Sequence, residues 1–493
     1  MIVLRLLLVL LLVLAVLLIT ALIRTLAGEK KRSTYVPRPD QDEALALAEK
    51  LSRMVQVETV SVPETDQREK FLAFHHCLEE LFPLVHERLE KTEIDGNLLY
   101  FWKGQASDRP LVLMSHQDVV PAEGQWEHAP FSGDIADGKV WGRGTSDTKC
   151  SVMAFFEAVE RLLSQNYVPP QDVYLSSSCT EEWAGDGCPK LVAELKRRGV
   201  RPWLVVDEGG GIITEPIGGI HGNFAMLGVF EKGKADVLFT ARSNGGHASA
   251  PKRNSPLARL GDFIHEMEHR NPFRRKLLPE VAAMFETLAP YASFPLRFVL
   301  GNLWLFKPLL LRVLPLISAQ AGAMLRTTIA FTMASGSDAF NVMPQEATVG
   351  ANLRFIPHQG MEESLGILRK KAEKYGLEMD VRHASDYTPA TDIRSEAFKT
   401  VERTVAEVFP GCPSSPYVMT GATDARFYQE ICDHVVRFAP VVYGPEQMKG
   451  MHGLNENIEY ACLPGAVAFY TKLIENVGSA APESTEQKAE EAL

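Results

Sequence analysis

The chain has 493 residues, 46% of them hydrophobic, and a formal net charge of −11. An ordinary apolar content at this length allows a large buried core, and we expect two domains. The acidic balance disfavours nucleic acid as a partner. Seven scattered cysteines exclude a disulfide framework and a zinc finger, because their spacing suits neither.

The amino-terminal end carries a membrane-like segment. Leu6–Ile23 is an apolar run of 18 residues without a charge, a length at the threshold for spanning a bilayer. We therefore expect residues 1–27 to form a transmembrane anchor or a signal, followed by a linker over residues 28–44. Positive charge is heavier on the carboxyl side of the run, which by itself favours a catalytic domain inside the cytoplasm.

The apolar run Leu111–Met114 predicts a strand buried on both faces of a helix-flanked, mostly parallel sheet in an α/β domain. His116 and Asp118 follow this run, and open α/β sheets bind ligands at the carboxyl ends of their strands. Side chains two residues apart in extended chain point the same way, so Asp118 can orient His116.

Acidic residues follow two further apolar runs. Val173–Leu175 precedes the pair Glu181 and Glu182, and Trp203–Val206 leads directly into Asp207–Glu208 and a row of glycines. Each acid stands where a buried strand is expected to end. The sequence therefore predicts that these acids belong to one site at the edge of the sheet.

Asp147 and His452 complete the pattern. Asp147 lies between a glycine-rich turn and the helical pattern Val152–Leu163, and His452 precedes Gly453, past the strand-like Val435–Phe438. Imidazole and carboxylate groups without a cysteine cluster suit zinc, manganese or cobalt. Together these residues predict the site of a two-metal hydrolase.

These segments resemble the di-zinc aminoacylase and glutamate carboxypeptidase family, most closely its carboxypeptidase S and N-fatty-acyl amino acid synthase/hydrolase branch. The resemblance covers roughly residues 45–475. Its most specific matches are short motifs, namely Ser115–Pro121, Trp126–Gly133, Gly142–Lys149, Thr180–Glu182, Val206–Gly210 and His452–Glu456.

The resemblance implies two zinc ions in each subunit, for which manganese or cobalt can substitute. Asp147 would bridge the two metals. His116 and Asp207 would complete the ligand set of the first metal. Glu182 and His452 would complete the ligand set of the second metal. Two such cations lower the pKa of a water molecule and polarise the scissile carbonyl.

The resemblance also implies a general base. Glu181 would take the proton of the attacking water and return it to the leaving amine. Asp118 would fix the tautomer of His116 from behind. Thr148 departs from the family pattern, where a second acid often follows the bridging aspartate. Because this position is not a ligand in the pattern, we expect activity to survive.

An inserted α+β domain is expected from residue 222 to residue 384, where strand-like stretches such as Val237–Ala241 and Ala347–Phe355 alternate with helical ones. This insertion divides the catalytic domain into residues 45–221 and 385–478. The resemblance implies that the inserted domain is a lid, which also carries the contact of a homodimer.

Substrate-binding residues follow from the same resemblance. His247, supplied by the neighbouring subunit, and Asn341 would stabilise the tetrahedral oxyanion. Arg354 would bind the substrate's free carboxylate through its planar guanidinium, with a surface ion pair as the alternative interpretation. A glycine loop containing Gly421 and Thr423 would line the site.

An apolar helical insertion is expected near residues 271–326 of the lid. Its most apolar part, Pro295–Ile317, contains Pro308 and Pro315, which disfavour a straight membrane span. The segment either packs on the lid, or forms an apolar shelf for an acyl chain or a patch that rests on a membrane. Residues 479–493 are expected to form a disordered tail.

Three functions are compatible with these patterns. The leading hypothesis is a zinc-dependent amidohydrolase that cleaves, and in reverse forms, the amide of N-acyl amino acids, above all N-fatty-acyl amino acids. A carboxypeptidase S-like peptidase or dipeptidase is the first alternative. A non-catalytic, membrane-tethered binding protein is the second, although a binder needs no base such as Glu181. Resemblance to secreted and vacuolar relatives favours an anchored or secreted catalytic domain outside the cytoplasm.

Overall fold

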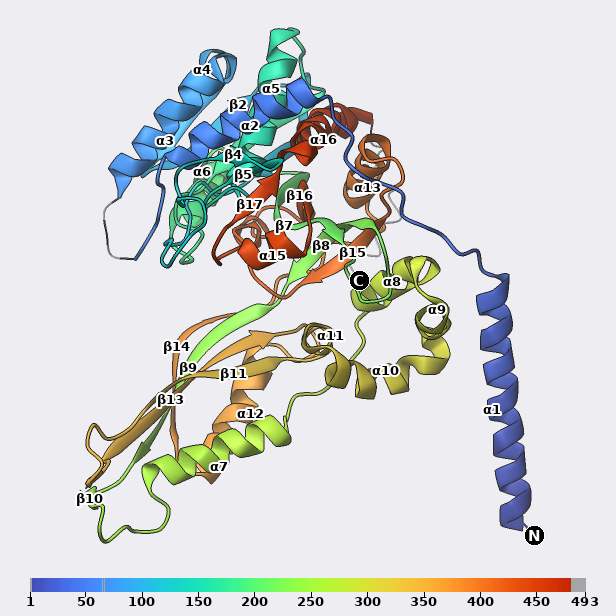
Figure 1. Ribbon diagram of the computed structural model, residues 1–493, viewed down its shortest axis with the longest axis vertical. Helices are drawn as coiled ribbons and strands as arrows, with labels where there is room; N and C mark the ends of the chain where they lie inside the picture. Colours follow the sequence, from blue (N-terminus) through green and yellow to red (C-terminus); the bar gives the residue numbers. More distant parts are fainter. Residues whose placement is uncertain (1, 64, 66, 480–493) are drawn as a thin grey trace.

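The computed structural model describes residues 2–63, 65 and 67–479, so the tail predicted over residues 479–493 lies almost entirely outside it. The described chain forms two units and a long amino-terminal helix, α1 (Ile2–Ala27), that stands beside them (Figure 1). Helix α1 is long and apolar enough to cross a membrane. A signal sequence can have the same length and composition.

The first unit is built on an eight-stranded sheet in the order β1-β2-β6-β3-β7-β16-β8-β15. Strands β6, β3, β7 and β16 run parallel, as do β8 and β15, but the remaining pairs are antiparallel. The sheet is therefore mixed: the predicted parallel arrangement holds for its centre, β6-β3-β7-β16, and antiparallel pairs flank that centre. The strands are β1 (Glu90–Ile94), β2 (Asn97–Trp102), β3 (Ala106–Met114), β6 (Gln171–Ser177), β7 (Leu204–Thr214), β8 (Asn223–Glu231), β15 (Ser414–Met419) and β16 (Val435–Tyr443).

Hairpins account for much of the antiparallel pairing. Asp95 and Gly96 join β1 to β2, and both have positive φ angles, 51° and 87°, as a tight two-residue hairpin requires. Because such a hairpin returns the chain without a crossover helix, its strands must be antiparallel.

The central strands are buried on both faces, as their continuous apolar runs predict. In β3, Leu111 and Leu113 belong to one hydrophobic core, whereas Val112 and Met114 belong to another on the opposite face. The first core includes α2 (Gln41–Gln56), α3 (Arg68–Leu81), α4 (Pro83–Arg88), α5 (Lys149–Ser164), α13 (Glu396–Val408) and α16 (Leu463–Asn476). The second core includes α6 (Gly187–Arg197) and α14 (Ala425–Tyr428).

A small sheet, in the order β17-β5-β4, lies next to the predicted site. Asn457 pairs with Trp141, so the segment after His452 is tied to the segment before Asp147. The elements are β4 (Ile135–Ala136), β5 (Lys139–Trp141), α15 (Pro445–Gly450), β17 (Asn457–Glu459) and the short helices η2 (Tyr460–Cys462) and η3 (Val477–Ser479).

The second unit is a four-stranded antiparallel sheet, in the order β11-β13-β9-β14, with two helices and a core of its own. Phe239 of the sheet packs against Phe263 of α7. The elements are β9 (Gly233–Arg242), β10 (Gly246–His247), α7 (Pro256–His269), β11 (Thr328–Ser335), β12 (Val342–Met343), β13 (Glu346–Phe355), α12 (Met361–Lys374) and β14 (Glu378–Ser385).

Two features differ from the expected domain boundaries. Strand β8 belongs to the large sheet, although it lies after residue 222. The apolar insertion also packs on the first unit rather than on the second, because its buried residues, from Leu277 to Leu325, join the first core. It contains α8 (Pro279–Leu288), η1 (Ala289–Tyr291), α9 (Phe294–Leu300), α10 (Leu303–Ile317) and α11 (Ala319–Ala323).

Candidate active site

Strand ends and loops of the first unit bring titratable side chains together around Asp147. His116 Nε2 lies 3.2 Å from one carboxylate oxygen of Asp147, and His452 Nε2 lies 3.0 Å from the other. His452 Nε2 also lies 3.1 Å from Glu182 Oε2. Asp147 thus stands between two imidazoles, which is the arrangement expected of a bridging carboxylate.

Two sets of side chains could each hold a metal ion, and they share Asp147. Within each set the ligand atoms lie within 4.8 Å of one another; the sets are His116, Asp147 and Glu208, and Asp147, Glu182 and His452. Imidazole nitrogen and carboxylate oxygen are ligands that zinc, manganese and cobalt accept. The residues present therefore fit a pair of divalent cations.

Glu208, rather than the predicted Asp207, stands in the first set. Asp207 is buried, and its two carboxylate oxygens accept hydrogen bonds from the backbone N–H groups of Glu208 and Ala425, each at 2.8 Å. Asp207 therefore ties the start of α14 to β7. The geometry favours Glu208 as the ligand, a role that the sequence patterns did not assign to it.

Asp118 is fully buried behind His116. The backbone carbonyl of Asp118 lies 2.9 Å from His116 Nδ1, and its carboxylate lies 3.5 Å from the same atom. The carboxylate also accepts hydrogen bonds from the backbone N–H groups of Glu181 and Glu182, each at 3.2 Å, and one from the Ser61 hydroxyl. Asp118 thereby orients the imidazole and also the loop that carries both glutamates.

Glu456 holds the loop that presents Asp147. Its Oε1 accepts hydrogen bonds from the backbone N–H groups of Gly144 at 3.0 Å and Ser146 at 2.9 Å. It accepts a third from the Asp147 N–H at 3.0 Å. Its Oε2 pairs with Arg143 Nη1 at 2.7 Å, and both side chains are buried. This carboxylate was not predicted to have a role, although it ends the motif that begins at His452.

Buried negative charge dominates the cluster. Burial raises the pKa of the Glu181 carboxyl well above its usual range, and it does the same for Glu208. Burial also raises the pKa of Asp147, but hydrogen bonds with His116 and His452 outweigh it and hold that pKa well below the usual range. Bound cations would neutralise the negative charge of these neighbouring carboxylates, and the imidazole and carboxylate groups present are suitable metal ligands.

His452 has both a shifted pKa and an unusual backbone. Hydrogen bonds with Asp147 and Glu182 raise the pKa of its imidazole to about 10. Its φ is 54°, in the left-handed region that non-glycine residues rarely adopt. Strained backbone of this kind clusters at functional sites, so its presence here agrees with a functional role for His452.

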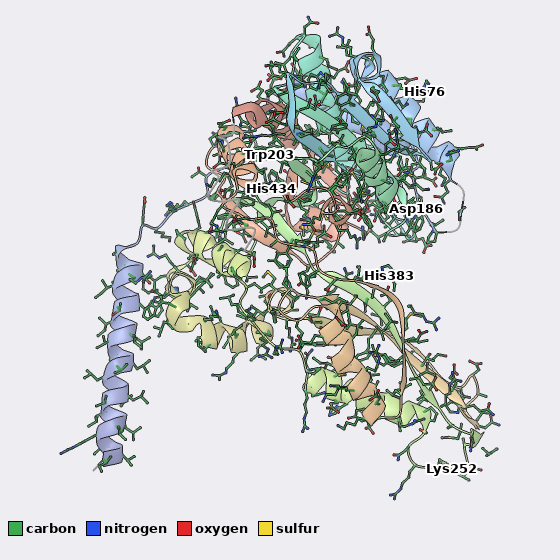
Figure 2. All side chains as sticks on the ribbon, turned by 180° about the vertical axis from the view of Figure 1, so that it is seen from behind. His76, Asp186, Trp203, Lys252, His383 and His434 are labelled. Carbon is green, nitrogen blue, oxygen red and sulfur yellow. The ribbon has the colours of Figure 1, made fainter. Side chains whose placement is uncertain are left out.

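His247 and Asn341 lie at the far end of the second unit. His247 is exposed on β10, and the Asn341 carbonyl accepts a hydrogen bond from Ala248 N–H at 3.0 Å. Lys252 marks this end, remote from Trp203, which precedes β7 (Figure 2). A single chain therefore does not bring His247 and Asn341 to the acidic cluster.

Arg354 lies on β13, in the second unit. It is half-buried, and its Nε donates a hydrogen bond to Asn352 Oδ1 at 3.2 Å. Burial lowers the pKa of Arg354. Lys232, where β8 passes into β9, is a second cation in this region, and burial together with the charge of Arg354 lowers its pKa to about 7. Lys232 Nζ donates hydrogen bonds to the carbonyls of Ala323 at 2.8 Å and Arg326 at 2.9 Å, so its role in the fold is to tie these segments together.

In the glycine loop that contains Gly421 and Thr423, the Thr423 side chain binds another side chain of the protein, although it was expected to contact the substrate. Thr423 is buried, and its hydroxyl donates a hydrogen bond to Glu231 Oε1 at 2.8 Å. Glu231 also accepts one from Arg437 Nε at 2.8 Å. The Thr423 hydroxyl therefore secures the loop within the core, whereas Gly421 remains partly exposed.

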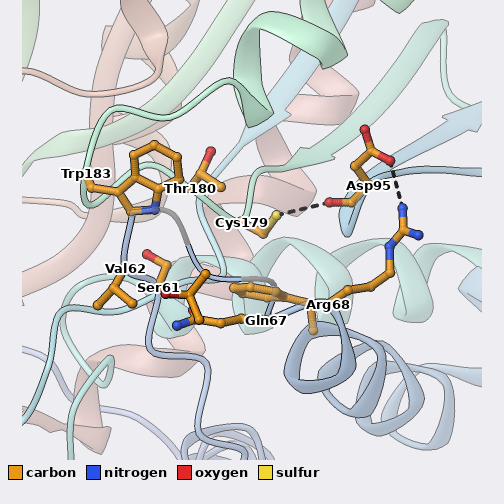
Figure 3. A pocket seen from close by; sticks show the side chains of 10 residues that line it. Ser61, Val62, Gln67, Arg68, Asp95, Cys179, Thr180 and Trp183 are labelled. Atoms are coloured by element: carbon orange, nitrogen blue, oxygen red, sulfur yellow. Dashed lines mark hydrogen bonds and ion pairs between the residues drawn. The ribbon is translucent and has the colours of Figure 1, made fainter.

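A pocket of about 350 Å³ lies next to the loop that carries Glu181 and Glu182. Thr180 and Trp183, which flank these glutamates, line it together with Ser61, the hydrogen-bond donor to Asp118 (Figure 3). None of the potential metal ligands lines this pocket. It is therefore adjacent to the cluster and distinct from it.

Similarity to known proteins adds to this description. The chain is 33% identical over 450 residues to an N-fatty-acyl-amino acid synthase/hydrolase of Xenopus tropicalis, covering 88% of this chain and 86% of the relative. It is 32% identical over 444 residues to a probable carboxypeptidase S-like protein of Dictyostelium discoideum, covering 88% and 85%.

The fold also matches a solved structure. An M20 family metallo-carboxypeptidase from Sulfolobus solfataricus superposes with a TM-score of 0.67 at 18% identity, covering 89% of this chain and all of that one. The model of peptidase family M20/M25/M40 matches residues 112–476, which include every potential metal ligand of the cluster. The chain therefore belongs to peptidase family M20/M25/M40.

Proposed function

We propose that this protein is a metal-dependent amidohydrolase that cleaves, and in reverse forms, the amide bond of N-fatty-acyl amino acids. The observation that carries the proposal is the shared position of Asp147 between two sets of imidazole and carboxylate ligands, beside the half-buried pair Glu181 and Glu182. The substrate class rests on similarity to the Xenopus tropicalis N-fatty-acyl-amino acid synthase/hydrolase over most of both chains.

The proposed ligand set follows the geometry. Asp147 is a ligand of both metals. His116 and Glu208 complete the ligand set of the first metal. Glu182 and His452 complete the ligand set of the second. Glu208 replaces Asp207 in this set. Zinc suits these ligands, with manganese or cobalt as substitutes. When bound, the two cations would supply the Lewis acidity that polarises a scissile carbonyl and acidifies a water molecule.

Glu181 is the proposed proton carrier. Its carboxylate takes a proton from the attacking water and returns it to the nitrogen of the leaving amino acid. Burial, which raises the pKa of this carboxyl, moves it toward the pH at which a base both accepts and releases a proton. Asp118 holds the Glu181 backbone in place through the 3.2 Å hydrogen bond.

Substrate recognition is proposed to come from the second unit. Arg354 would bind the free carboxylate through its planar guanidinium, which donates a hydrogen bond to Asn352 of the same strand. His247 and Asn341 would stabilise the oxyanion from a partner subunit, since their own chain holds them away from the cluster. This proposal requires a homodimer formed through the second unit, which would act as a lid.

The proposed location is a membrane anchor through α1, with the catalytic unit outside the cytoplasm. The helix is long and apolar enough for this role. A cleaved signal would give a secreted enzyme instead. In either case the catalytic unit works outside the cytoplasm.

A carboxypeptidase S-like peptidase is the second candidate, favoured by the similarity to the Dictyostelium discoideum protein. The same metals, base and carboxylate site would serve both reactions. They differ only in the group on the acyl side of the scissile bond, which is a fatty acyl chain in one case and an amino acid in the other.

The test is a substrate panel with the zinc-loaded protein: N-oleoyl-phenylalanine, N-acetyl-phenylalanine and the dipeptide Gly-Phe. We expect the oleoyl substrate to have the highest kcat/KM. Glu181→Gln should lower kcat by about 10²–10⁴-fold, whereas Glu49→Gln, an exposed residue of α2, should change nothing. A preference for Gly-Phe would favour the peptidase, and no turnover of any substrate would refute both.

A further inference from the structure

The helices α9 and α10 have a composition unlike the rest of this acidic chain. From residue 287 to residue 337 there is no aspartate or glutamate, but there are four cations, Arg297, Lys307, Arg312 and Arg326. Basic segments rich in leucine and aromatic residues are typical of helices that lie at a membrane surface.

Helix α10 is apolar on its outward face as well as on its inward face. Leu310 and Leu314 are buried against the first unit. On the outward face the exposed fractions are 48% for Trp304, 49% for Leu309 and 80% for Leu316. Lys307 and Arg312 are exposed on the same helix. Large exposed apolar side chains beside cations mark an interaction surface.

This surface adjoins the candidate membrane span. Asn302, between α9 and α10, donates hydrogen bonds from Nδ2 to Thr25 Oγ1 at 2.9 Å and to the Ala21 carbonyl at 3.3 Å. Just beyond α1, the backbone N–H of Lys31 donates to the Pro290 carbonyl at 2.9 Å. Figure 1 shows α9 beside the carboxyl-terminal end of α1. Helix α10 is therefore fixed near the end of α1.

We propose that the outward face of α10 lies in the headgroup region of the bilayer that α1 enters, against phospholipid headgroups. The cations would meet the lipid phosphates, Trp304 would lie at the interface, and the leucines would reach the acyl chains. Helices α9 and α10 meet at an angle of 105°, so the pair does not form a straight span.

Charge excludes a second copy of this face as the occupant. Two such faces would bring four or more cations together without an acid between them, and like charges at a contact are repulsive. The phosphate groups of the phospholipids supply the missing negative charge. The proposal concerns membrane contact alone, so it stands or falls independently of the hydrolase activity.

The test uses cysteine probes in the full chain. All seven native cysteines are buried, so an added exposed cysteine is the selective site for a polarity-sensitive fluorophore. Leu309→Cys and Leu316→Cys report on α10, and Leu72→Cys, an exposed leucine of α3 in the first unit, is the matched control. Each labelled protein is reconstituted in vesicles of phosphatidylcholine and phosphatidylserine, with and without doxyl-labelled lipid.

We expect the probes at positions 309 and 316 to show a blue shift, quenching by doxyl lipid and loss of quenching by aqueous iodide. The probe at position 72 should show none of these changes. Two results would overturn the proposal. One is equal iodide quenching at all three positions. The other is iodide protection on α10 without doxyl quenching, which would indicate a protein contact.

Discussion

Asp207 and Glu208 are neighbours in the chain, but their carboxylates have different surroundings. Asp207 accepts two backbone hydrogen bonds inside the protein, whereas Glu208 faces His116 and Asp147. Neighbouring side chains of a strand point to opposite faces, which accounts for the difference. Arg437 is paired with Asp207, but the next pair, Ala439 with Gly211, leaves extra residues on β7. The alternation separates the two carboxylates, but beside such an irregularity it does not tell which of them faces the cluster.

A matched pair of variants tests this assignment. Glu208→Gln should reduce the bound zinc from about two ions per subunit to about one, because a ligand is lost. Asp207→Asn should keep both ions and act mainly on the stability of the α14 segment. The measurement is metal content by mass spectrometry after dialysis. The opposite pattern, with the loss of zinc in Asp207→Asn alone, would restore Asp207 as the ligand.

The protonation of His452 predicts how metal binding depends on pH. Without metal, Asp147 and Glu182 raise its pKa to about 10, so the imidazole carries a proton at neutral pH. Metal requires the neutral imidazole, so binding releases this proton. Apparent zinc affinity should therefore rise by about tenfold per pH unit for each proton released.

Titration calorimetry at pH 7 in two buffers with different ionisation enthalpies counts these protons. We expect net release, and release of one proton fewer in His452→Asn. Proton uptake on zinc binding, or an affinity that does not change between pH 6 and pH 8, would contradict this role of His452.

At the scale of the elements, the loop from Gly142 to Asp147 depends on Glu456. This carboxylate joins the loop to the segment after His452 through backbone hydrogen bonds and the buried pair with Arg143. Removing one partner of a buried ion pair leaves a charge without compensation. Glu456 is thus a positioning residue for Asp147 rather than a catalytic one.

Glu456→Gln should lower the free energy of unfolding by about 3 kcal/mol, because Arg143 would remain buried as an uncompensated cation. It should also weaken zinc binding, since Asp147 would be held less firmly. Urea unfolding and zinc titration measure both effects. Glu459→Gln, an exposed neighbour on β17, is the control. Unchanged stability and unchanged zinc affinity would refute the positioning role.

The elements that position the cluster could be predicted from the sequence. The apolar runs Leu111–Met114, Val173–Leu175 and Val435–Phe438 lie within β3, β6 and β16, and the helical pattern Val152–Leu163 lies within α5. A run buried on both faces needs no tertiary information to be recognised. The mixed order of the sheet could not be predicted, because hairpins and crossovers leave similar local patterns.

At the scale of the whole molecule, the second unit presents His247 away from its own cluster. The two-stranded pair β10 and β12 stands at the end of the unit remote from the large sheet (Figure 1). If this histidine acts in catalysis, it must act in the cluster of a partner subunit. The sequence could indicate the residue but not the distance, which depends on the length and direction of β9 and β13.

Subunit mixing tests this arrangement. His247→Ala and Glu181→Ala should each be inactive alone. An equal mixture should recover about a quarter of the activity, because half of the dimers would be mixed and each would hold one intact site. Lys252→Ala, at the same end of the unit, should remain active. No recovery despite confirmed mixing would place His247 outside the partner's site.

Anomalous X-ray diffraction at the zinc edge, from crystals of the zinc-loaded protein, tests the proposed metal centre directly. We expect two peaks in each subunit that share Asp147, one beside His116 and Glu208 and the other beside Glu182 and His452. A single peak, or a first peak coordinated by Asp207 while Glu208 points away, would contradict the proposed centre.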